Sequence, residues 1–339
     1  MKILVIGGTR FFGYHTVKQL LKDGHDVTLY NRGQTPDDFG DSVSHIRGDR
    51  CDPSGFFSQL RGMTFDVVID MIAFKQKDSQ NAVRTFQGNI GHFIHISTAA
   101  VYIMTKDYPC PLREEDYDRP LYPQSKERSE LWSYAHHKRE CEEVLLKAHS
   151  KNGFPVTMLR LPIVMGERDY TLRAYSYFLR IQDRKPIILP DSGLNVFTHV
   201  YQGDIVKTIA SNLQNFRAFG KAYNLAQEEI VSLRDFVLKA GEVLGIKTKL
   251  VDIPSEILAK CSLGTTFSPL FGRRPFVLNV RKARQELDYS STPWHVWMER
   301  TVRWFTDEYK GEPPDNYGLR KKEIEVAERY LKSLKSFSF

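Results

Sequence analysis

Short apolar runs alternate with amphipathic stretches through the first half of the chain. Between the runs, apolar residues recur at the spacing of one helix face, as Val17, Leu20 and Leu21 do. The runs are KILVI (2–6), DVTLY (26–30), VSHI (43–46), FDVVID (65–70), HFIHIS (92–97) and VTMLRL (156–161). Strands that alternate with helices in this way indicate a parallel sheet with right-handed crossovers. We therefore predict an α/β fold with a doubly wound parallel sheet.

The alternation loosens after Gly166, which indicates two structural parts. Residues 1–166 are expected to form a Rossmann-like domain, which a return segment at about 198–228 rejoins. We assign 167–197 and 229–311 to a smaller C-terminal substrate-binding lobe. We expect helices at Asp204–Leu213 and near Leu233–Leu244, and a strand between them at AYNLA (222–226).

Residues 312–339 are expected to form a C-terminal linker and helix. The linker is EPPDN (312–316), and apolar residues follow it at helical spacing. These residues are Ile324, Ala327, Leu331 and Leu334. We expect this side of the helix to pack on the domain or on a partner.

The composition is that of a globular protein with a core. Hydrophobic residues make up 41% of the chain and charged residues 26%. The 4 cysteines form no CxxC pair and no cluster with histidine, so neither a disulfide framework nor a metal site is expected. The first apolar run meets Gly7 and Gly8 too soon for a signal peptide, and no run approaches the ~18 residues of a membrane span. We expect a cytoplasmic protein that binds no membrane.

The formal net charge of +7 makes phosphate-bearing ligands and polyanions candidate partners. Basic side chains concentrate in Gly318–Phe339, which we interpret as a solvated helix face. The aromatic and basic stretch Tyr170–Arg184 is interpreted as packing within the substrate lobe. Charge alone therefore does not choose between a nucleic acid and a small phosphorylated ligand.

The sequence GGTRFFG (7–13) joins the first strand to the first helix. Backbone N–H groups approach a pyrophosphate closely only where no side chain intervenes, at the positive end of a helix dipole. Glycines hold the outer positions of this GxxGxxG-type turn, and an arginine holds the middle one. A purely structural tight turn is the alternative. The predicted dinucleotide contacts here are Gly7, Thr9, Arg10, Phe11, Phe12 and Gly13.

The end of the second strand predicts which cofactor is preferred. NAD sites have an acidic residue there for the ribose hydroxyls, whereas this chain has Asn31 followed by Arg32. A neutral side chain does not repel a 2′-phosphate, and both Arg32 and Arg10 are placed to reach one. We predict NADP rather than NAD, with an ordinary exposed loop arginine as the alternative for Arg32.

Further cofactor contacts are expected where later strands end. Asp49, in the GDR turn after the third strand, is placed either to accept from the adenine amino group or to cap the next helix. The backbone after the fourth strand is expected to line the cofactor. The remaining predicted cofactor residues are Arg50, Met71, Ile72, Ala73, Ser97, Lys138 and Pro162.

A tyrosine and a lysine four positions apart follow the fifth strand. Tyr134 and Lys138 begin an amphipathic helix and project from the same face. A phenol has a pKa near ~10, and a nearby cation favours the phenolate, so Tyr134 is the candidate general acid or base. A second YxxxK match, Tyr122 to Lys126, has no apolar helix face around it, and we favour the first.

Two hydroxyls, Ser97 and Thr98, end the fifth strand. Open α/β sheets bind ligands at this end of a central strand, so either hydroxyl is placed to bind a substrate oxygen together with Tyr134. The alternative is that these hydroxyls satisfy backbone groups at the strand end.

From Met1 to about Trp304, these motifs together resemble the extended branch of the short-chain dehydrogenase/reductase family, the NAD-dependent epimerase/dehydratase group. The GGTRFFG turn and the VVID strand are more similar to an atypical subgroup, which includes RNA-binding chloroplast stem-loop-binding proteins and bacterial epimerase-like proteins. Unlike the former, this chain keeps the full YxxxK. The other matching motifs are GDR, ISTAAVY, YAHHK, LRLPIVMG, HVYQGDI and RRPFVLNVRKARQEL.

The resemblance implies that Thr98 is the catalytic hydroxyl, Tyr134 the acid/base and Lys138 its partner. The implied reaction is hydride transfer between a sugar carbinol and a nicotinamide. Dehydratases of the group carry acidic residues just after the hydroxyl, where this chain has Ala99 and Ala100. Epimerisation or carbonyl reduction is therefore expected rather than elimination.

The chain departs from the resemblance at substrate positions. Nucleotide-sugar enzymes of the group often have an asparagine and an arginine where this chain has Ile163 and Asn195. Arg274 remains as the implied diphosphate ligand. The interval before the YxxxK is longer than usual and implies an inserted loop over the site. The predicted substrate-binding residues are Thr98, Tyr134, Asn195 and Arg274.

We therefore expect an NAD(P)-dependent epimerase or ketoreductase, an isomerase or oxidoreductase acting on a sugar or nucleotide-sugar-like substrate. One alternative is a nucleic-acid (RNA) binding protein on a Rossmann scaffold. The other is an NADP-bound sensor without turnover. The substrate's identity stays open, and so does the choice between a monomer and a homodimer.

Overall fold

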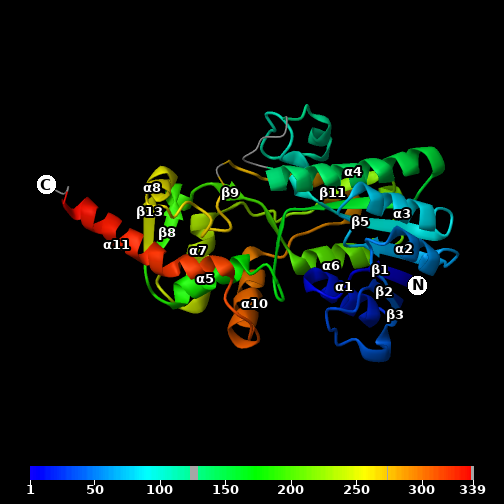
Figure 1. Ribbon diagram of the computed structural model, residues 1–339, viewed down its shortest axis with the longest axis horizontal. Coiled ribbons are helices and arrows are strands. Elements are labelled where there is room, and N and C mark those ends of the chain that lie inside the picture. The colour runs from blue at the N-terminus through cyan, green and yellow to red at the C-terminus, as the bar shows by residue number, and fades with distance from the viewer. Residues whose placement is uncertain (123–128, 273, 337–339) are drawn as a thin grey trace. The chain divides into compact units, whose positions relative to one another are not determined.

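The seven principal strands form one sheet in the order β11-β6-β5-β4-β1-β2-β3 (Figure 1). The computed structural model describes residues 1–122, 129–272 and 274–336. Each neighbouring pair in the sheet is parallel, which confirms the predicted doubly wound α/β fold. The strands are β1 (Lys2–Ile6), β2 (Asp26–Asn31), β3 (Ser44–Arg47), β4 (Phe65–Asp70), β5 (Ile90–Thr98), β6 (Val156–Leu161) and β11 (Lys221–Asn224).

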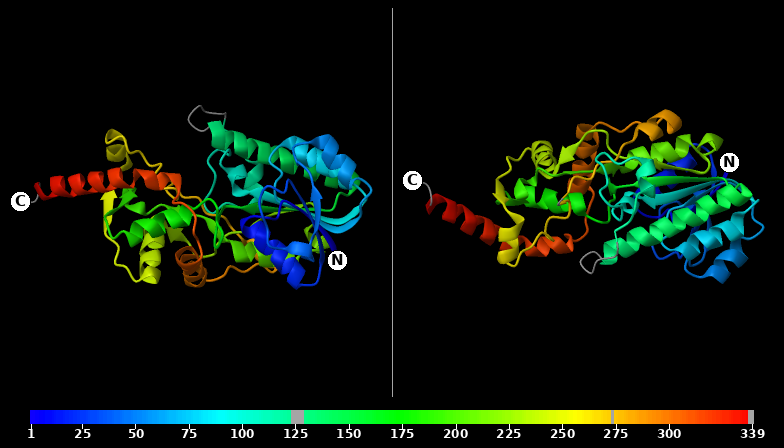
Figure 2. Two further views of the ribbon diagram at one scale, coloured as in Figure 1. Left: turned by 60° about the horizontal axis from the view of Figure 1, so that its bottom comes forward. Right: turned by 90° about the horizontal axis from the view of Figure 1, so that it is seen from above.

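Helices cover both faces of the sheet. On one face, α1 (Phe11–Lys22) packs beside α6 (Gln202–Ser211). On the other, α2 (Pro53–Leu60), α3 (Gln76–Phe86) and α4 (Ser129–Asn152) follow one another, and Figures 1 and 2 show α3 and α4 side by side. The strand order reverses at β1, so a ligand crevice is expected where β1 and β4 end.

A row of aromatic rings packs the sheet against α2 and α3. Tyr30 contacts Phe56 with ring centroids 5.1 Å apart, and Phe56 contacts Phe86 at 6.0 Å. The row continues to Phe93 at 6.3 Å and then to Phe154 at 5.3 Å. All five rings are buried, so this row forms much of the core under the helices.

The chain divides into two compact units. The first comprises Met1–Val164, His199–Glu228 and Leu278–Ser291, and the rest forms the second. We assigned 278–291 to the substrate lobe from the sequence, but Asn279 N donates to Leu112 O (2.7 Å) within the first unit. This segment carries α9 (Arg281–Leu287), which packs against β11. Two short strands, β7 (Ile163–Met165) and β10 (His199–Tyr201), pair with each other, and the first unit ends within β7, at Val164.

The second unit has two small sheets surrounded by helices. In one sheet β8 (Ile187–Pro190) and β13 (Leu250–Ile253) run parallel, and in the other β9 (Val196–Phe197) and β12 (Val231–Ser232) run antiparallel. Its helices are α5 (Arg173–Gln182), α7 (Leu233–Leu244), α8 (Ser255–Lys260), α10 (Trp294–Asp307) and α11 (Arg320–Ser336). Among the helices of the described residues, none has the length and hydrophobicity of a membrane span.

The C-terminal helix α11 packs within the second unit through part of the predicted side, because Ala327 is fully buried. Leu331 and Leu334 are 38% and 50% exposed and do not pack on the unit, so packing on a partner stays a prediction for them. The buried side includes Glu323, whose carboxylate accepts from Arg180 Nη2 at 2.6 Å. Val326 and Ala327 enter the core on the same side of the helix as this buried ion pair.

Candidate cofactor and catalytic site

Three segments predicted to bind cofactor or substrate lie at the carboxyl ends of the adjacent strands β1, β4 and β5. The first is the glycine turn, and the third is the end of β5. The second consists of residues 71–75 between β4 and α3, which we call loop 71–75. Met71 N donates to Ile6 O at 3.1 Å, and Gly7 N donates to Tyr30 O at 3.0 Å. The glycine turn and loop 71–75 are therefore held together at the crevice where open α/β sheets bind ligands.

The glycine turn brings three elements into close contact. Gly8 has φ +87°, and a Cβ there would lie 2.9 Å from Val5 Cγ1. A Cβ on Gly13 would lie 2.9 Å from Met71 Sδ and 3.1 Å from Gly8 Cα. Both positions therefore require glycine, because α1 packs directly on the turn and on loop 71–75. Helix α1 begins at Phe11, so its positive end faces this turn.

Arginines surround the end of β2. Asn31 Oδ1 accepts from Gly33 N at 2.9 Å and also from Arg47 Nη1. Arg10 Nε donates to Thr35 Oγ1 at 3.0 Å, and Arg32 is exposed. The sequence prediction omitted Arg47. Its signal was its place at the end of the next strand, because Asn31 and Arg47 are partners in the β2–β3 register.

Asp49 and Arg50, neighbours in the GDR turn, point in different directions. Asp49 is exposed, and its Oδ1 accepts from Cys51 N at 2.8 Å. Asp52 caps α2 by accepting from Ser54 N at 3.1 Å, so the alternative that Asp49 caps this helix is wrong. The Arg50 side chain is only 4% exposed and lies inside the unit.

Lys138 bridges the carboxyl ends of two strands. Its Nζ donates to Ala73 O at 2.8 Å in loop 71–75 and to Ile96 O at 2.7 Å in β5. The side chain is buried, and this burial lowers the pKa of the ammonium, while Cys141 and the carboxylate of Asp70 act in the opposite direction.

Tyr134 lies one helical turn before Lys138 on α4. Its side chain is 38% exposed, whereas the next residue, Ala135, is buried. Thr98 Oγ1 accepts from Ala100 N at 3.2 Å at the start of the 3-10 helix Ala99–Tyr102. The Thr98 hydroxyl thus satisfies a backbone group, as one alternative held, and still keeps its hydrogen for a second partner.

Ser97 belongs to a buried polar network. Its hydroxyl donates to Glu142 Oε1 at 2.5 Å, and Glu142 pairs with Arg160 at 2.7 Å. Arg160 Nη1 in turn donates to Tyr102 Oη at 2.7 Å. The prediction did not include Glu142 or Arg160. Their signals were a carboxylate one turn after Lys138 and a single arginine in the apolar strand VTMLRL.

The remaining predicted residues lie elsewhere. Pro162 is half-buried between β6 and β7. Asn195 and Arg274 belong to the second unit, where Asn195 Nδ2 donates to Gly272 O at 3.0 Å and Arg274 is exposed. In the second YxxxK match, Tyr122 Oη donates to Asp107 Oδ1 at 3.0 Å, and Lys126 lies outside the described residues.

The long interval before the YxxxK is anchored to α4 in its described part. It contains the 3-10 helix Glu114–Asp118. Arg139 Nη2 donates to Tyr117 O at 2.6 Å, and the guanidinium lies 3.6 Å from the centroid of the Tyr117 ring. The insertion is therefore fixed to the helix that carries Tyr134 and Lys138.

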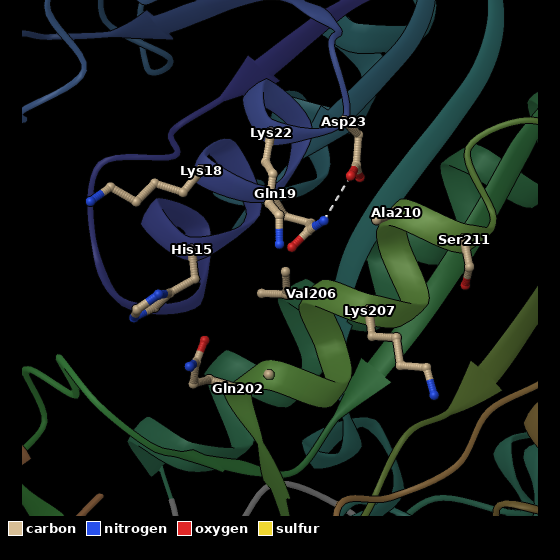
Figure 3. A pocket seen from close by; sticks show the side chains of 11 residues that line it. His15, Lys18, Gln19, Lys22, Asp23, Gln202, Val206, Lys207, Ala210 and Ser211 are labelled. Atoms are coloured by element: carbon tan, nitrogen blue, oxygen red, sulfur yellow. Dashed lines mark hydrogen bonds between the residues drawn. The ribbon is translucent and has the colours of Figure 1, made fainter. Parts of the chain in front are cut away.

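A basic groove of about 590 Å³ lies between α1 and α6 and contains none of the predicted site residues. Figure 3 shows Lys22 of α1 pointing toward α6, with Gln19 donating to Asp23 beside it. The groove is lined by His15, Lys18, Gln19, Lys22, Asp23, Gln202, Gly203, Val206, Lys207, Ala210 and Ser211. Within the described part of the chain, no group of at least three His, Cys, Asp or Glu residues is placed to hold a metal ion.

Comparison with known proteins covers most of the chain. A model of the NAD dependent epimerase/dehydratase family matches residues 3–226. The chloroplast stem-loop binding protein of 41 kDa b of Arabidopsis thaliana is 28% identical over 244 residues, which are 68% of this chain and 60% of that protein. The match thus spans less than two thirds of the plant protein's length.

Two enzymes match over nearly their whole length. The UDP-N-acetyl-alpha-D-glucosaminuronate decarboxylase of Bacillus cytotoxicus is 23% identical over 329 residues, covering 90% of this chain and 98% of that protein. The structure of UDP-glucuronic acid 4-epimerase from Bacillus cereus in complex with NAD has a TM-score of 0.70 at 20% identity, covering 92% of this chain and 99% of that one. At this identity the structural match shows a shared fold.

Proposed function

The chain belongs to the NAD dependent epimerase/dehydratase family, and from this premise we propose that it is an NAD(P)-dependent epimerase or ketoreductase. It would move a hydride reversibly between the cofactor and a carbinol carbon of a sugar or nucleotide sugar. The observation that carries this proposal is the position of Lys138. Its ammonium donates to Ala73 O in loop 71–75, after β4, and to Ile96 O in β5. Lys138 itself lies one helical turn after Tyr134 on α4.

The residues at the crevice fit a dinucleotide. Gly7 has φ +101°, and the side-chain-free backbone at Gly8 and Gly13 lies at the positive end of α1, which suits a pyrophosphate. When bound, the nicotinamide would accept or return the hydride. The residues that would hold the cofactor are Gly7, Thr9, Arg10, Phe11, Phe12, Gly13, Asn31, Arg32, Asp49, Met71, Ile72, Ala73, Lys138 and Pro162.

Tyr134 would take the hydroxyl proton of the substrate while the carbinol carbon of the substrate loses the hydride. In the reverse direction, Tyr134 would return that proton. The cation of Lys138 favours the phenolate that this step requires. Thr98 would donate its hydroxyl hydrogen to the substrate oxygen, since the bond from Ala100 N uses a lone pair of the Thr98 oxygen and not that hydrogen. These three side chains supply an acid/base, an electrostatic partner and an orienting donor.

Elimination of water is a less suitable reaction for this site. The two positions after Thr98 carry the methyl groups of Ala99 and Ala100, which are both buried. Neither residue can donate or accept a proton for a leaving hydroxide. Epimerisation or carbonyl reduction therefore fits the chain better than dehydration.

NADP is the cofactor that we propose for this site. Asn31 places no negative charge at the end of β2, and the cations Arg10, Arg32 and Arg47 lie near that end. These cations would attract the negatively charged 2′-phosphate of NADP, whereas the ribose 2′-hydroxyl of NAD carries no charge.

The substrate that we propose is a nucleotide sugar, since the two enzymes that match over their whole length are named for UDP-sugars. Exposed Arg274 is the proposed ligand for the diphosphate. Asn195 would take a lesser part, because its amide already donates to Gly272 O.

The test is cofactor binding and hydride transfer by wild type, Tyr134→Phe and Tyr122→Phe, with UDP-glucose and UDP-glucuronic acid as probes. Tyr134→Phe should keep NADP affinity and lose transfer by about 10²-fold or more. Tyr122→Phe, at the tyrosine of the other YxxxK match, should retain both. If the wild type binds neither NAD nor NADP, or if Tyr134→Phe transfers hydride normally, the proposal is wrong.

The basic groove supports a second candidate function, RNA binding. Three lysines and one aspartate lie among its lining residues, and the chain carries a net charge of +7. The plant relative is named for stem-loop binding. Both functions fit on one chain, because the groove is lined by α1 and α6 and shares no residue with the catalytic prediction.

A further inference from the structure

Arg50 connects the turn after β3 to both ends of loop 71–75. Its Nη2 donates to Asp70 Oδ2 at 2.5 Å, at the end of β4, and to Asp78 O at 2.9 Å, in the first turn of α3. The guanidinium lies 4.5 Å from the centroid of the Phe56 ring. With the side chain only 4% exposed, these contacts are made inside the unit.

The same two aspartates hold the backbone of loop 71–75. Asp70 Oδ1 accepts from Ile72 N at 3.2 Å. Asp78 Oδ2 accepts from Phe74 N at 2.8 Å and from Lys75 N at 2.9 Å. Three backbone donors of this loop, those of Ile72, Phe74 and Lys75, are thus bound to carboxylates of two residues that Arg50 ties together.

Loop 71–75 in turn holds the ammonium of Lys138. Ala73 lies between the donors that Asp70 and Asp78 fix, and its carbonyl accepts from Lys138 Nζ at 2.8 Å. The other backbone acceptor of this ammonium, Ile96 O, belongs to the rigid ladder of β5. Of the two backbone acceptors that hold the Lys138 ammonium, the one in loop 71–75 is therefore the one whose position can change.

We propose that Arg50 is a positioning residue, which fixes loop 71–75 and through it the ammonium of Lys138. This inference rests on the proposed function, in which Lys138 and loop 71–75 contact the cofactor. It replaces the predicted direct contact between Arg50 and the cofactor. Nη2 of the guanidinium donates to Asp70 and Asp78, and the side chain is buried.

Charge explains why an arginine occupies this position. Burial raises the pKa of Asp70, and the Arg50 guanidinium opposes this by favouring the carboxylate that accepts from Ile72 N. A single nitrogen of Arg50, Nη2, reaches both the Asp70 carboxylate and Asp78 O, while the plane of the guanidinium lies over the Phe56 ring. A lysine keeps the charge, but its side chain is one atom shorter and has no plane to lie over that ring.

Two substitutions test the proposal in the full chain. Arg50→Lys keeps the cation, and Arg50→Met combined with Asp70→Asn removes both charges without leaving a buried carboxylate unpaired. Arg180→Lys is the matched control. Arg180 also bridges a buried carboxylate, Glu323, and a carbonyl, Phe267 O, but in the second unit.

Hydrogen exchange and NADPH titration are the two measurements. In both Arg50 variants, the amides of Ile72, Phe74 and Lys75 should exchange faster, and NADPH affinity should fall about tenfold. Arg180→Lys should change neither quantity. If the folded Arg50 variants exchange the amide hydrogens of loop 71–75 at the wild-type rate, the proposal is wrong. If wild type does not bind NADPH, the proposed function fails, and exchange alone decides the role of Arg50.

A double-mutant cycle separates positioning from direct contact. If Arg50 acts through Lys138, the losses of NADPH affinity in Arg50→Lys and Lys138→Met should be far from additive. Additive losses would mean that Arg50 meets the cofactor independently, and would overturn the proposal. A general loss of stability is distinguished by thermal unfolding, since the affinity of the folded protein would then stay unchanged.

Discussion

The hydroxyl of Ser97 donates a hydrogen bond of 2.5 Å to the carboxylate of Glu142 in the interior of the first unit. The next hydroxyl along the strand, that of Thr98, is partly exposed and accepts from Ala100 N. Side chains of consecutive strand residues point to opposite faces, which separates two hydroxyls that look equivalent in the sequence.

This separation predicts different effects for Ser97→Ala and Thr98→Ala. Thr98→Ala should lower the hydride-transfer rate by about 10²-fold, because the substrate oxygen loses its orienting donor, with little change in stability. Ser97→Ala should cost about 1–3 kcal/mol of unfolding free energy, because a buried carboxylate loses a partner. Turnover measurements with urea unfolding on both variants check this. The reverse pattern would assign the catalytic role to Ser97.

The strands were readable from the sequence because a parallel sheet covered on both faces has continuous apolar strands. The four-residue spacing of Tyr134 and Lys138 is equally local. What the sequence did not reveal are buried partnerships between distant residues. Arg50 is tied to Asp70, 20 positions away, and its side chain is buried inside the unit.

The C-terminal helix illustrates the same limit. Apolar spacing alone predicted a stripe of which Ala327 is buried, whereas Leu331 and Leu334 are exposed. The packed side also holds Glu323, whose partner Arg180 lies 143 positions away in the chain. The spacing of apolar residues does not predict that a charged residue is buried, because its partner lies on another element.

Asn31→Asp should shift cofactor preference from NADP to NAD. A carboxylate at the end of β2 would repel the 2′-phosphate and accept from a ribose 2′-hydroxyl, so NADP affinity should fall about tenfold or more while NAD affinity holds or rises. Fluorescence titration of both cofactors measures the shift. Gln34→Glu adds the same charge at an exposed position of the same loop and should have a smaller effect. An equal loss for NAD and NADP would contradict the predicted role of Asn31.

His92 should make the stability of the protein depend on pH. It is 1% exposed, with Nδ1 2.8 Å from Leu213 O and Nε2 2.8 Å from Thr157 Oγ1. Burial lowers its pKa from 6.5 to about 4. Between pH 6.5 and about pH 4 the unfolded chain takes up a proton that the folded chain does not. The unfolding free energy therefore falls as pH drops, by about 3 kcal/mol in total for this group.

The check is urea unfolding across this pH range for wild type and His92→Gln. The variant lacks the titrating ring, so its unfolding free energy should decline less steeply between pH 6.5 and pH 4. His295→Gln, at an exposed histidine of the second unit, controls for the substitution itself. Identical slopes for wild type and His92→Gln would show that His92 does not carry this pH dependence.

The basic groove gives the RNA-binding candidate a local test. Lys22 and Lys207 line it from α1 and α6, so replacing both with glutamate should weaken binding of a stem-loop RNA across sequences and reduce its salt dependence. Each lost phosphate contact should lower the slope of log affinity against log salt by about one. Lys147→Glu, at an exposed lysine of α4 on the other face of the sheet, should leave binding nearly unchanged. Wild-type protein that fails to bind the RNA at moderate salt would exclude this candidate, and equal losses in all the lysine variants would show that net charge, not the groove, attracts the RNA.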